Sequence, residues 1–286
     1  MVPPQLETSG AAGSWPWRLG CAALMALAGL SLPWMMGLLL FSAEAVTPPT
    51  LVRMFLALAV LPALAAHLLL RTRGADISIG ASELVVRARD VTMEVSGRAV
   101  GRIAPWLVPL PTPGFSIQLR SGQWLQYGVS VEDPRPLLEA FASDCACPAA
   151  AAAVEHPVVQ WAHARARHGR ASWRDLLIKY PVFGLAPTVL LFNAHQHISF
   201  GGFFGQWNLE SPAAWWRTLL EYWLILIIYL VLYAGVVRAA AEAAAMLATW
   251  ASAARAGTAR LWAERFCHVL YYAGVPALVG LRFVDW

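Results

Sequence analysis

Four stretches of the chain are apolar over nearly the whole length that a helix needs to cross a lipid bilayer. A helix spans the hydrocarbon with about 20 predominantly apolar residues. The stretches that reach this length are residues 20–42, 51–70, 176–194 and 218–237. Residues 258–283 supply a further apolar stretch in their second half. We therefore expect a mostly α-helical integral membrane protein with four to five spans.

The composition favours the same class of protein. Charged residues make up 13% of the chain and hydrophobic residues 58%, whereas a soluble domain carries about 25% charged residues. The 14 Trp residues fit a membrane protein, because Trp collects at membrane–water interfaces. The net charge is +4 without a dense basic run, which argues against a nucleic-acid partner. Lys179 is the only lysine, and this preference for Arg, together with abundant Ala, indicates a GC-rich bacterial genome.

The arginines distinguish the two sides of the predicted membrane. Residues 43–50 and 195–216 contain no Lys or Arg. The basic segments are residues 71–73, 165–179 and 255–265. Because basic loops stay on the cytoplasmic side, we place the chain in the bacterial inner membrane. The N-terminus, the segment between the second and third spans, and residues 238–265 are then cytoplasmic, and residues 195–216 face the periplasm.

The segment between the second and third spans predicts a small β-rich domain of the α+β class. Its short runs of β-branched and aromatic residues are broken by Gly, Ser and Pro, as in strands. The sequence LRSGQW predicts a hairpin turn, and Asp133 predicts the N-cap of a helix. The apolar face of that helix is predicted to hold Leu137, Leu138 and Phe141. The predicted parts are a two-helix membrane hairpin (1–73), the β-rich domain (74–145), a linker with a basic helix (146–179), and a C-terminal membrane region (180–286).

The stretch PGFSIQLRSGQWLQYGVSVEDPRPLLEAF, residues 113–141, resembles the bacterial pleckstrin-homology-like domains found in membrane proteins. Those domains are runs of antiparallel strands followed by one C-terminal helix. The resemblance covers about residues 75–143 and implies such a domain inserted between membrane spans. The family brings no catalytic motif, so the resemblance implies a fold and no enzymatic activity.

Residues 157–179 combine arginines with tryptophans and predict a basic helix lying on the membrane surface. The predicted lipid-contacting residues are Trp161, Arg165, Arg167, Arg170, Trp173 and Arg174. Each basic residue near an anionic surface contributes about 1 kcal/mol to binding. The anionic lipids of the inner leaflet are therefore an expected partner, together with a protein whose identity the sequence does not give.

His195 and His197, in the stretch FNAHQHISFGGFFGQW, are candidate metal ligands. In an extended segment two histidines at this spacing can share an ion, whereas in a helix they point about 200° apart. Zinc needs a third ligand, and nearby only Glu210 offers one. We therefore favour a structural loop that dips into the interface, in which Gly201 and Gly202 supply backbone freedom.

Charged residues inside a predicted span are functional candidates by default. Arg217 precedes Glu221 by four residues, and Arg238 precedes Glu242 by four. Both spacings bring a pair onto one helix face. We therefore interpret the two pairs as structural ion pairs within the fourth helix.

Two further groups of His and Cys residues suggest cofactor sites and lack the expected spacing. His67 and His268 each lie near the inner end of a span, as axial haem ligands do. The other group is Cys145, Cys147, His156, His163 and His168. Its spacing matches no zinc pattern. We expect no cofactor and unreactive cysteines.

The sequence defines the function of the chain less well than its architecture. The sequence holds no Walker motif and no Ser/His/Asp order typical of a hydrolase. We favour an accessory or scaffold protein without enzymatic activity, whose cytoplasmic domain docks a partner protein or the membrane surface. One alternative is a membrane-embedded redox or metal-dependent enzyme subunit that uses His195 and His197. The other is a component of a small transporter or channel.

Overall fold

The computed structural model describes residues 6–42, 46–80, 83–88, 91–168 and 172–284. The chain forms two compact units. The first, here called the sheet unit, comprises Met1–Ala28, Ala59–Gly169 and Glu242–Ala263. The second, the helical unit, comprises Gly29–Leu58, Arg170–Ala241 and Glu264–Trp286. Several boundaries between the units fall inside helices.

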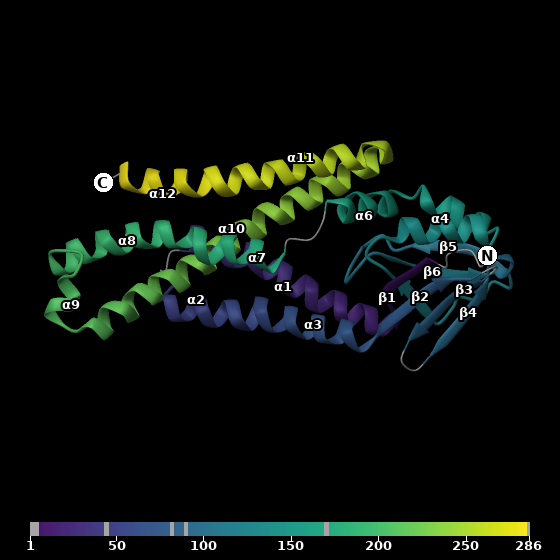
Figure 1. The fold of residues 1–286 in the computed structure, drawn as a ribbon, viewed down its shortest axis with the longest axis horizontal. Coiled ribbons are helices and arrows are strands. Elements are labelled where there is room, and N and C mark those ends of the chain that lie inside the picture. The colour runs from purple at the N-terminus through teal and green to yellow at the C-terminus, as the bar shows by residue number, and fades with distance from the viewer. Residues whose placement is uncertain (1–5, 43–45, 81–82, 89–90, 169–171, 285–286) are drawn as a thin grey trace. The chain divides into compact units, whose positions relative to one another are not determined.

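Within the described residues, seven strands form one antiparallel sheet in the order β4-β3-β2-β1-β7-β6-β5 (Figure 1). The strands are β1 (Leu6–Ser14), β2 (Gly74–Ile79), β3 (Glu83–Ala88), β4 (Thr92–Ser96), β5 (Val100–Pro105), β6 (Gly114–Leu119) and β7 (Tyr127–Ser130). β4 and β5 are the two edges of this sheet. The predicted β-rich domain is therefore confirmed as an antiparallel sheet.

The central strand β1 was not predicted, because its sequence LETSGAAGS lacks the β-branched and aromatic residues typical of strands. β1 pairs with β2 on one side and with β7 on the other. Its small residues allow this close approach: a Cβ added at Gly10 would lie 2.4 Å from the carbonyl oxygen of Ser130. Packing against both neighbours therefore selects the strand, and that packing leaves no periodic signal in the sequence.

The core of the sheet unit lies between the sheet and α4 (Pro134–Asp144). Leu137, Leu138 and Phe141 are each no more than 1% exposed, which confirms the predicted apolar face. Burying one such side chain stabilises the fold by about 1.5–3 kcal/mol. The predicted N-cap is also confirmed, since the Asp133 carboxylate accepts a hydrogen bond from the Arg135 N–H at 3.2 Å. Gly122 has a φ of 86°, as the predicted hairpin turn requires.

Four helices among the described residues are long and apolar enough to cross a membrane, as predicted. They are α1 (Trp15–Phe41), the helix Pro48–Thr72, the helix Trp173–Phe200, and α10 (Pro212–Ala251). The second contains α2 (Pro48–Phe55), the π-helical turn η1 (Leu56–Val60) and α3 (Leu61–Thr72). The third contains α7 (Trp173–Leu177), the π-helical turn η3 (Ile178–Val182) and α8 (Phe183–Phe200).

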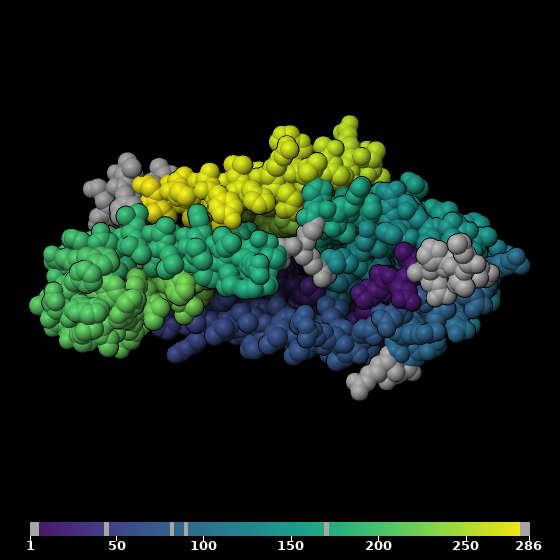
Figure 2. Space-filling model, viewed as in Figure 1, coloured from purple at the N-terminus to yellow at the C-terminus, as the bar shows by residue number. Residues whose placement is uncertain are grey.

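The last helical stretch is interrupted by another π-helical turn. It consists of α11 (Ala256–Val269), η5 (Leu270–Gly274) and α12 (Val275–Val284), and it is not among the candidate spans found within the described residues. In the helical unit, η5 contacts α8, where the rings of Tyr272 and Phe183 are 5.3 Å apart; Figures 1 and 2 show the last helical stretch in yellow. The short helices are α5 (Pro148–Val154), α6 (Pro157–Arg167), α9 (Gly205–Leu209), and the 3-10 turns η2 (Gly97–Ala99) and η4 (Ala253–Arg255).

Candidate functional site

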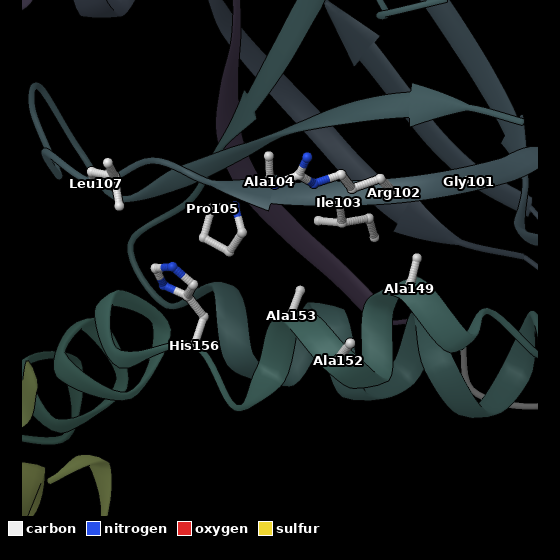
Figure 3. Close-up of a pocket in the computed structure, with 10 residues that line it drawn as sticks. All are labelled: Gly101, Arg102, Ile103, Ala104, Pro105, Leu107, Ala149, Ala152, Ala153 and His156. Carbon is white, nitrogen blue, oxygen red and sulfur yellow. The ribbon is translucent and has the colours of Figure 1, made fainter. Parts of the chain in front are cut away.

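A pocket of about 580 Å³ lies in the sheet unit between edge strand β5 and helix α5 (Figure 3). Residues 101–105 of β5 line it without interruption. Side chains alternate between the two faces of a strand. An unbroken run of lining residues therefore indicates that the pocket runs along β5, the edge strand of the sheet. We call this pocket the edge groove.

The opposite wall of the edge groove is formed by α5. Space remains between α5 and β5 because α5 consists almost entirely of alanine. Ala150 and Ala153 are buried in the core of the sheet unit, at 0% and 4% exposed. Ala149 and Ala152 also line the groove, and Figure 3 shows their methyl groups pointing toward β5. Larger side chains at these positions would fill the space.

The backbone of β5 offers hydrogen-bonding groups to the groove. The Trp106 N–H donates to the Gly114 carbonyl on β6, with the two atoms 2.9 Å apart. Because the backbone groups of successive residues alternate between the two edges of a strand, those of Ile103 and Pro105 face away from β6. Proline has no N–H, which limits strand pairing along an exposed edge. The edge therefore provides a small number of donors and acceptors.

Two basic side chains line the groove. Arg102 is exposed, and His156 lies at the end near Leu107 (Figure 3). Burial lowers the pKa of His156 from its ordinary value, so the ring is neutral at pH 7. Its Nδ1 accepts a hydrogen bond from the Val158 N–H at 3.3 Å, and its ring packs edge-on against Trp250, 5.5 Å away. His156 is therefore fixed as the N-cap of α6, and Arg102 is the charged group that a ligand would meet.

The prediction of a loop around His195 and His197 is wrong, because α8 continues as a helix to Phe200. The two imidazoles therefore point to different sides of one helix. The Nδ1 of His197 donates to the Asn193 carbonyl at 2.9 Å, and the His195 ring lies 5.3 Å from that of Tyr222. Among the described residues, no three His, Cys, Asp or Glu side chains are placed to hold a metal ion.

Gln196, which lies between the two histidines, is a buried polar residue that was not singled out from the sequence. It is 0% exposed, and its Nε2 donates to Oε1 of Gln206 at 2.8 Å. Gln206 in turn donates to Glu210 at 2.9 Å. This chain of amides joins α8 to α9. His195, Gln196 and His197 are all polar. The sequence alone therefore does not show which of the three faces inward.

Gly201 and Gly202 were both expected to supply backbone freedom, and this holds for Gly201 only. Gly201 ends α8 with a φ of 76°, a conformation that favours glycine. A Cβ at Gly202 would meet nothing within 4 Å. The second position that requires glycine is Gly205, where a Cβ would lie 2.2 Å from the Phe200 carbonyl oxygen.

The predicted single basic helix is wrong, since residues 157–179 form two helices, α6 and α7. Trp161 is 6% exposed and so is not free to enter a membrane, whereas Trp173 is 67% exposed. α6 is bound to the sheet unit by His163, whose Nδ1 is 2.9 Å from the Asp133 carboxylate. Arg165 and Arg167 are exposed, and Arg174 lies 5.7 Å from the centre of the Trp173 ring. Arg170 lies outside the described residues.

Two of the four residues predicted to pair within the fourth helix have partners on α11. Arg217 and Glu221 are 3.9 Å apart, as predicted, and both are largely exposed. The Nη1 of Arg238 is 2.7 Å from Oε2 of Glu264. In the sheet unit, the Nη1 of Arg260 is 2.7 Å from Oε1 of Glu242. The sequence reasoning missed Arg260 and Glu264 because only spacing within one helix was considered.

The cysteines and the remaining histidines form no common site. Cys145 and Cys147 are 5% and 1% exposed and belong to the core of the sheet unit. Burial raises the pKa of the Cys145 thiol to about 11, and the neighbouring Asp144 carboxylate adds to this rise. The thiol is therefore protonated at neutral pH and a poor nucleophile. His268 donates from Nδ1 to the Glu264 carbonyl at 2.8 Å, and His67 is exposed on α3.

No family model, no curated protein and no solved structure matches this chain.

Proposed function

We propose that this chain is a membrane-anchored docking protein of the bacterial inner membrane. Its sheet unit lies in the cytoplasm, and the edge groove binds an extended, acidic segment of a partner protein. The observation that carries this proposal is the open edge of β5 facing the alanine surface of α5. We further propose that the sheet with α4 is a pleckstrin-homology-like domain, which the antiparallel pairing of the strands and the packing of α4 on the sheet support.

The position of β1 supports a location of the sheet unit on one side of a membrane. β1 leads directly into α1, and β2 follows α3 after one residue, yet the two strands are neighbours in one sheet. A chain that pairs them must leave and re-enter the same compartment, which two crossings achieve. The contact of His156 with Trp250 supports a second return after the next two spans. The distribution of arginines supports the cytoplasm as that compartment.

The chemistry of the edge groove favours an extended peptide over a compact ligand. Backbone groups at the edge of β5 can bind a peptide as an added strand. The apolar surface of Ile103 and Ala152 suits apolar side chains, and the exposed guanidinium of Arg102 suits a carboxylate. The N–H missing at Pro105 keeps the pairing short, so side-chain contacts with the groove must supply the selectivity.

We expect Ala152→Phe to weaken peptide binding strongly, because the ring fills the groove. The test is selection of extended peptides from a random display library by the full-length protein in detergent micelles. The parent chain should enrich peptides that contain acidic residues, and Ala152→Phe should weaken their binding about tenfold or more. Ala151→Phe is the matched control, since Ala151 is exposed on the same helix and does not line the groove. Equal binding by parent and Ala152→Phe would refute the groove as the docking site.

Arg102 tests the acidic part of the proposal separately. Arg102→Glu should lose the preference for acidic peptides, whereas Arg98→Glu should keep it, because Arg98 is exposed in η2 and does not line the groove. An unchanged preference in Arg102→Glu would contradict an acidic partner.

The two alternatives from the sequence gain no support from the geometry. A metal site at His195 and His197 needs both imidazoles on one side, and their helix turns them apart. No observation among the described residues favours a transporter or channel.

A further inference from the structure

Lys179, the only lysine of the chain, occupies an unusual position in the helical unit. It lies in the π-helical turn η3, and its ammonium group is 4.6 Å from the centre of the Tyr271 ring and 5.4 Å from that of Tyr180. Aromatic faces attract a cation through their quadrupole, and more strongly where water is excluded. The side chain is therefore held against the helices instead of extending freely into solvent.

Two π-helical turns contact each other at this position. The Tyr271 hydroxyl, on η5, donates to the Lys179 carbonyl at 2.6 Å. The Tyr233 hydroxyl donates to the Leu270 carbonyl at 3.0 Å, and the absence of a Cβ at Gly274 allows this approach, because a Cβ there would be 2.8 Å from the hydroxyl. π-helical turns interrupt the regular helical hydrogen bonds and recur at functional sites. Here two of them meet at a single cation.

Lys179 is a cation without a carboxylate partner in the part of the chain that the structure describes. Among the described residues, its close partners are the two aromatic rings, and no carboxylate lies at ion-pair distance. The Glu264 carboxylate is already engaged by Arg238, at 2.7 Å. An anion placed beside Lys179 would supply the missing counter-charge.

We propose that Lys179 binds a phosphate group, and that this phosphate belongs to the headgroup of an anionic lipid. Lys179 lies near the beginning of the third apolar stretch. Headgroup phosphates lie at that depth, where long basic side chains reach them. Lysine binds phosphate as a point charge, and the nearby tyrosines hold the ammonium in place.

A single lysine allows a direct test on the unmodified full-length protein. The purified chain is placed in nanodiscs of phosphatidylglycerol or of phosphatidylcholine and treated with an uncharged amine-acylating reagent. Mass spectrometry then reports acylation of Lys179, with the N-terminal amine as internal reference. We expect Lys179 to react about fivefold more slowly in phosphatidylglycerol. Equal rates in the two lipids, after correction by the reference amine, would overturn the proposal.

Adding inorganic phosphate distinguishes the two possible ligands, the free phosphate ion and the phosphate of a lipid headgroup. If adding it to phosphatidylcholine nanodiscs slows acylation as much as phosphatidylglycerol does, the site binds phosphate and its ligand is the free ion, so the lipid assignment is wrong. No effect of inorganic phosphate, with protection by phosphatidylglycerol, supports the headgroup.

Variants provide an independent readout. Phosphatidylglycerol should raise the Tm of the parent, of Lys179→Arg and of Arg255→Gln, and should leave that of Lys179→Gln unchanged. Arg255 is the matched control, because it is an exposed basic residue in η4. A full rise in Lys179→Gln would show that general surface charge explains the effect. If Lys179→Gln does not fold, the acylation rates of the parent chain decide the question.

Discussion

Replacing Arg260 by Met should destabilise the protein by about 3–5 kcal/mol, the cost of leaving one partner of a buried ion pair without its counter-charge. Arg260 is 3% exposed, and its Nη1 is 2.7 Å from Oε1 of Glu242. The pair joins α10 to α11 within the sheet unit. In a thermal melt in detergent, the Tm of Arg260→Met should fall by about 10 °C.

The matched control is Arg217→Met. Its ion pair with Glu221 is 3.9 Å long, and the two side chains are 76% and 65% exposed. Exposed pairs contribute about 0–1 kcal/mol, so this variant should melt close to the parent. The double variant Arg260→Met/Glu242→Leu should recover much of the loss, because the isolated carboxylate is removed. A Tm for Arg260→Met no lower than that of Arg217→Met would contradict the buried pair.

The second large effect is expected at Gly10 in the centre of the sheet. A Cβ at this position would lie 2.4 Å from the Ser130 carbonyl oxygen and 2.6 Å from Cδ1 of Ile77. Because β1 is hydrogen-bonded on both sides, neither neighbour can move without disturbing the sheet. Gly10→Ala should therefore cost about 2–3 kcal/mol, as overpacking does in a rigid core.

The comparison for Gly10 is Gly74→Ala in strand β2. The nearest atom to a Cβ there is the Arg71 carbonyl oxygen at 3.7 Å, an ordinary contact. Limited proteolysis at increasing temperature should show earlier cleavage of the sheet unit in Gly10→Ala and parent-like cleavage in Gly74→Ala. Similar profiles for the two variants would mean that β1 does not occupy the centre of the sheet.

The parts of the fold that were predictable are those with a local physical cause. Apolar length alone identifies the helices that can span a membrane. The N-cap at Asp133 and the spacing of Leu137, Leu138 and Phe141 predict α4 and its buried face. In each case neighbouring residues determine the structure, so the sequence pattern contains the answer.

The parts that were missed depend on residues distant in the chain. β1 is a strand because β2 and β7 pair with it. The apolar face of α6 was predicted to meet lipid, yet Trp161 is buried in the protein and His163 binds Asp133, 30 residues earlier. An amphipathic pattern shows that a helix has an apolar face and does not show what covers it. Likewise, the edge groove depends on which strand lies at the edge of the sheet, and the sequence of a single strand does not show this.

The most direct test of the proposed architecture is labelling of single cysteines from the two sides of the membrane in intact cells. The positions are Ser9→Cys in β1, Ser121→Cys in the hairpin turn and Asn208→Cys in α9, which are all exposed. The parent chain is the blank, since Cys21, Cys145 and Cys147 are buried and Cys267 is partly so. We expect a membrane-impermeant maleimide to label Asn208→Cys in intact cells, and Ser9→Cys and Ser121→Cys only after the membrane is opened. Labelling of Ser121→Cys from outside, or of Ser9→Cys and Ser121→Cys from opposite sides, would contradict a cytoplasmic sheet unit anchored by membrane-spanning helices.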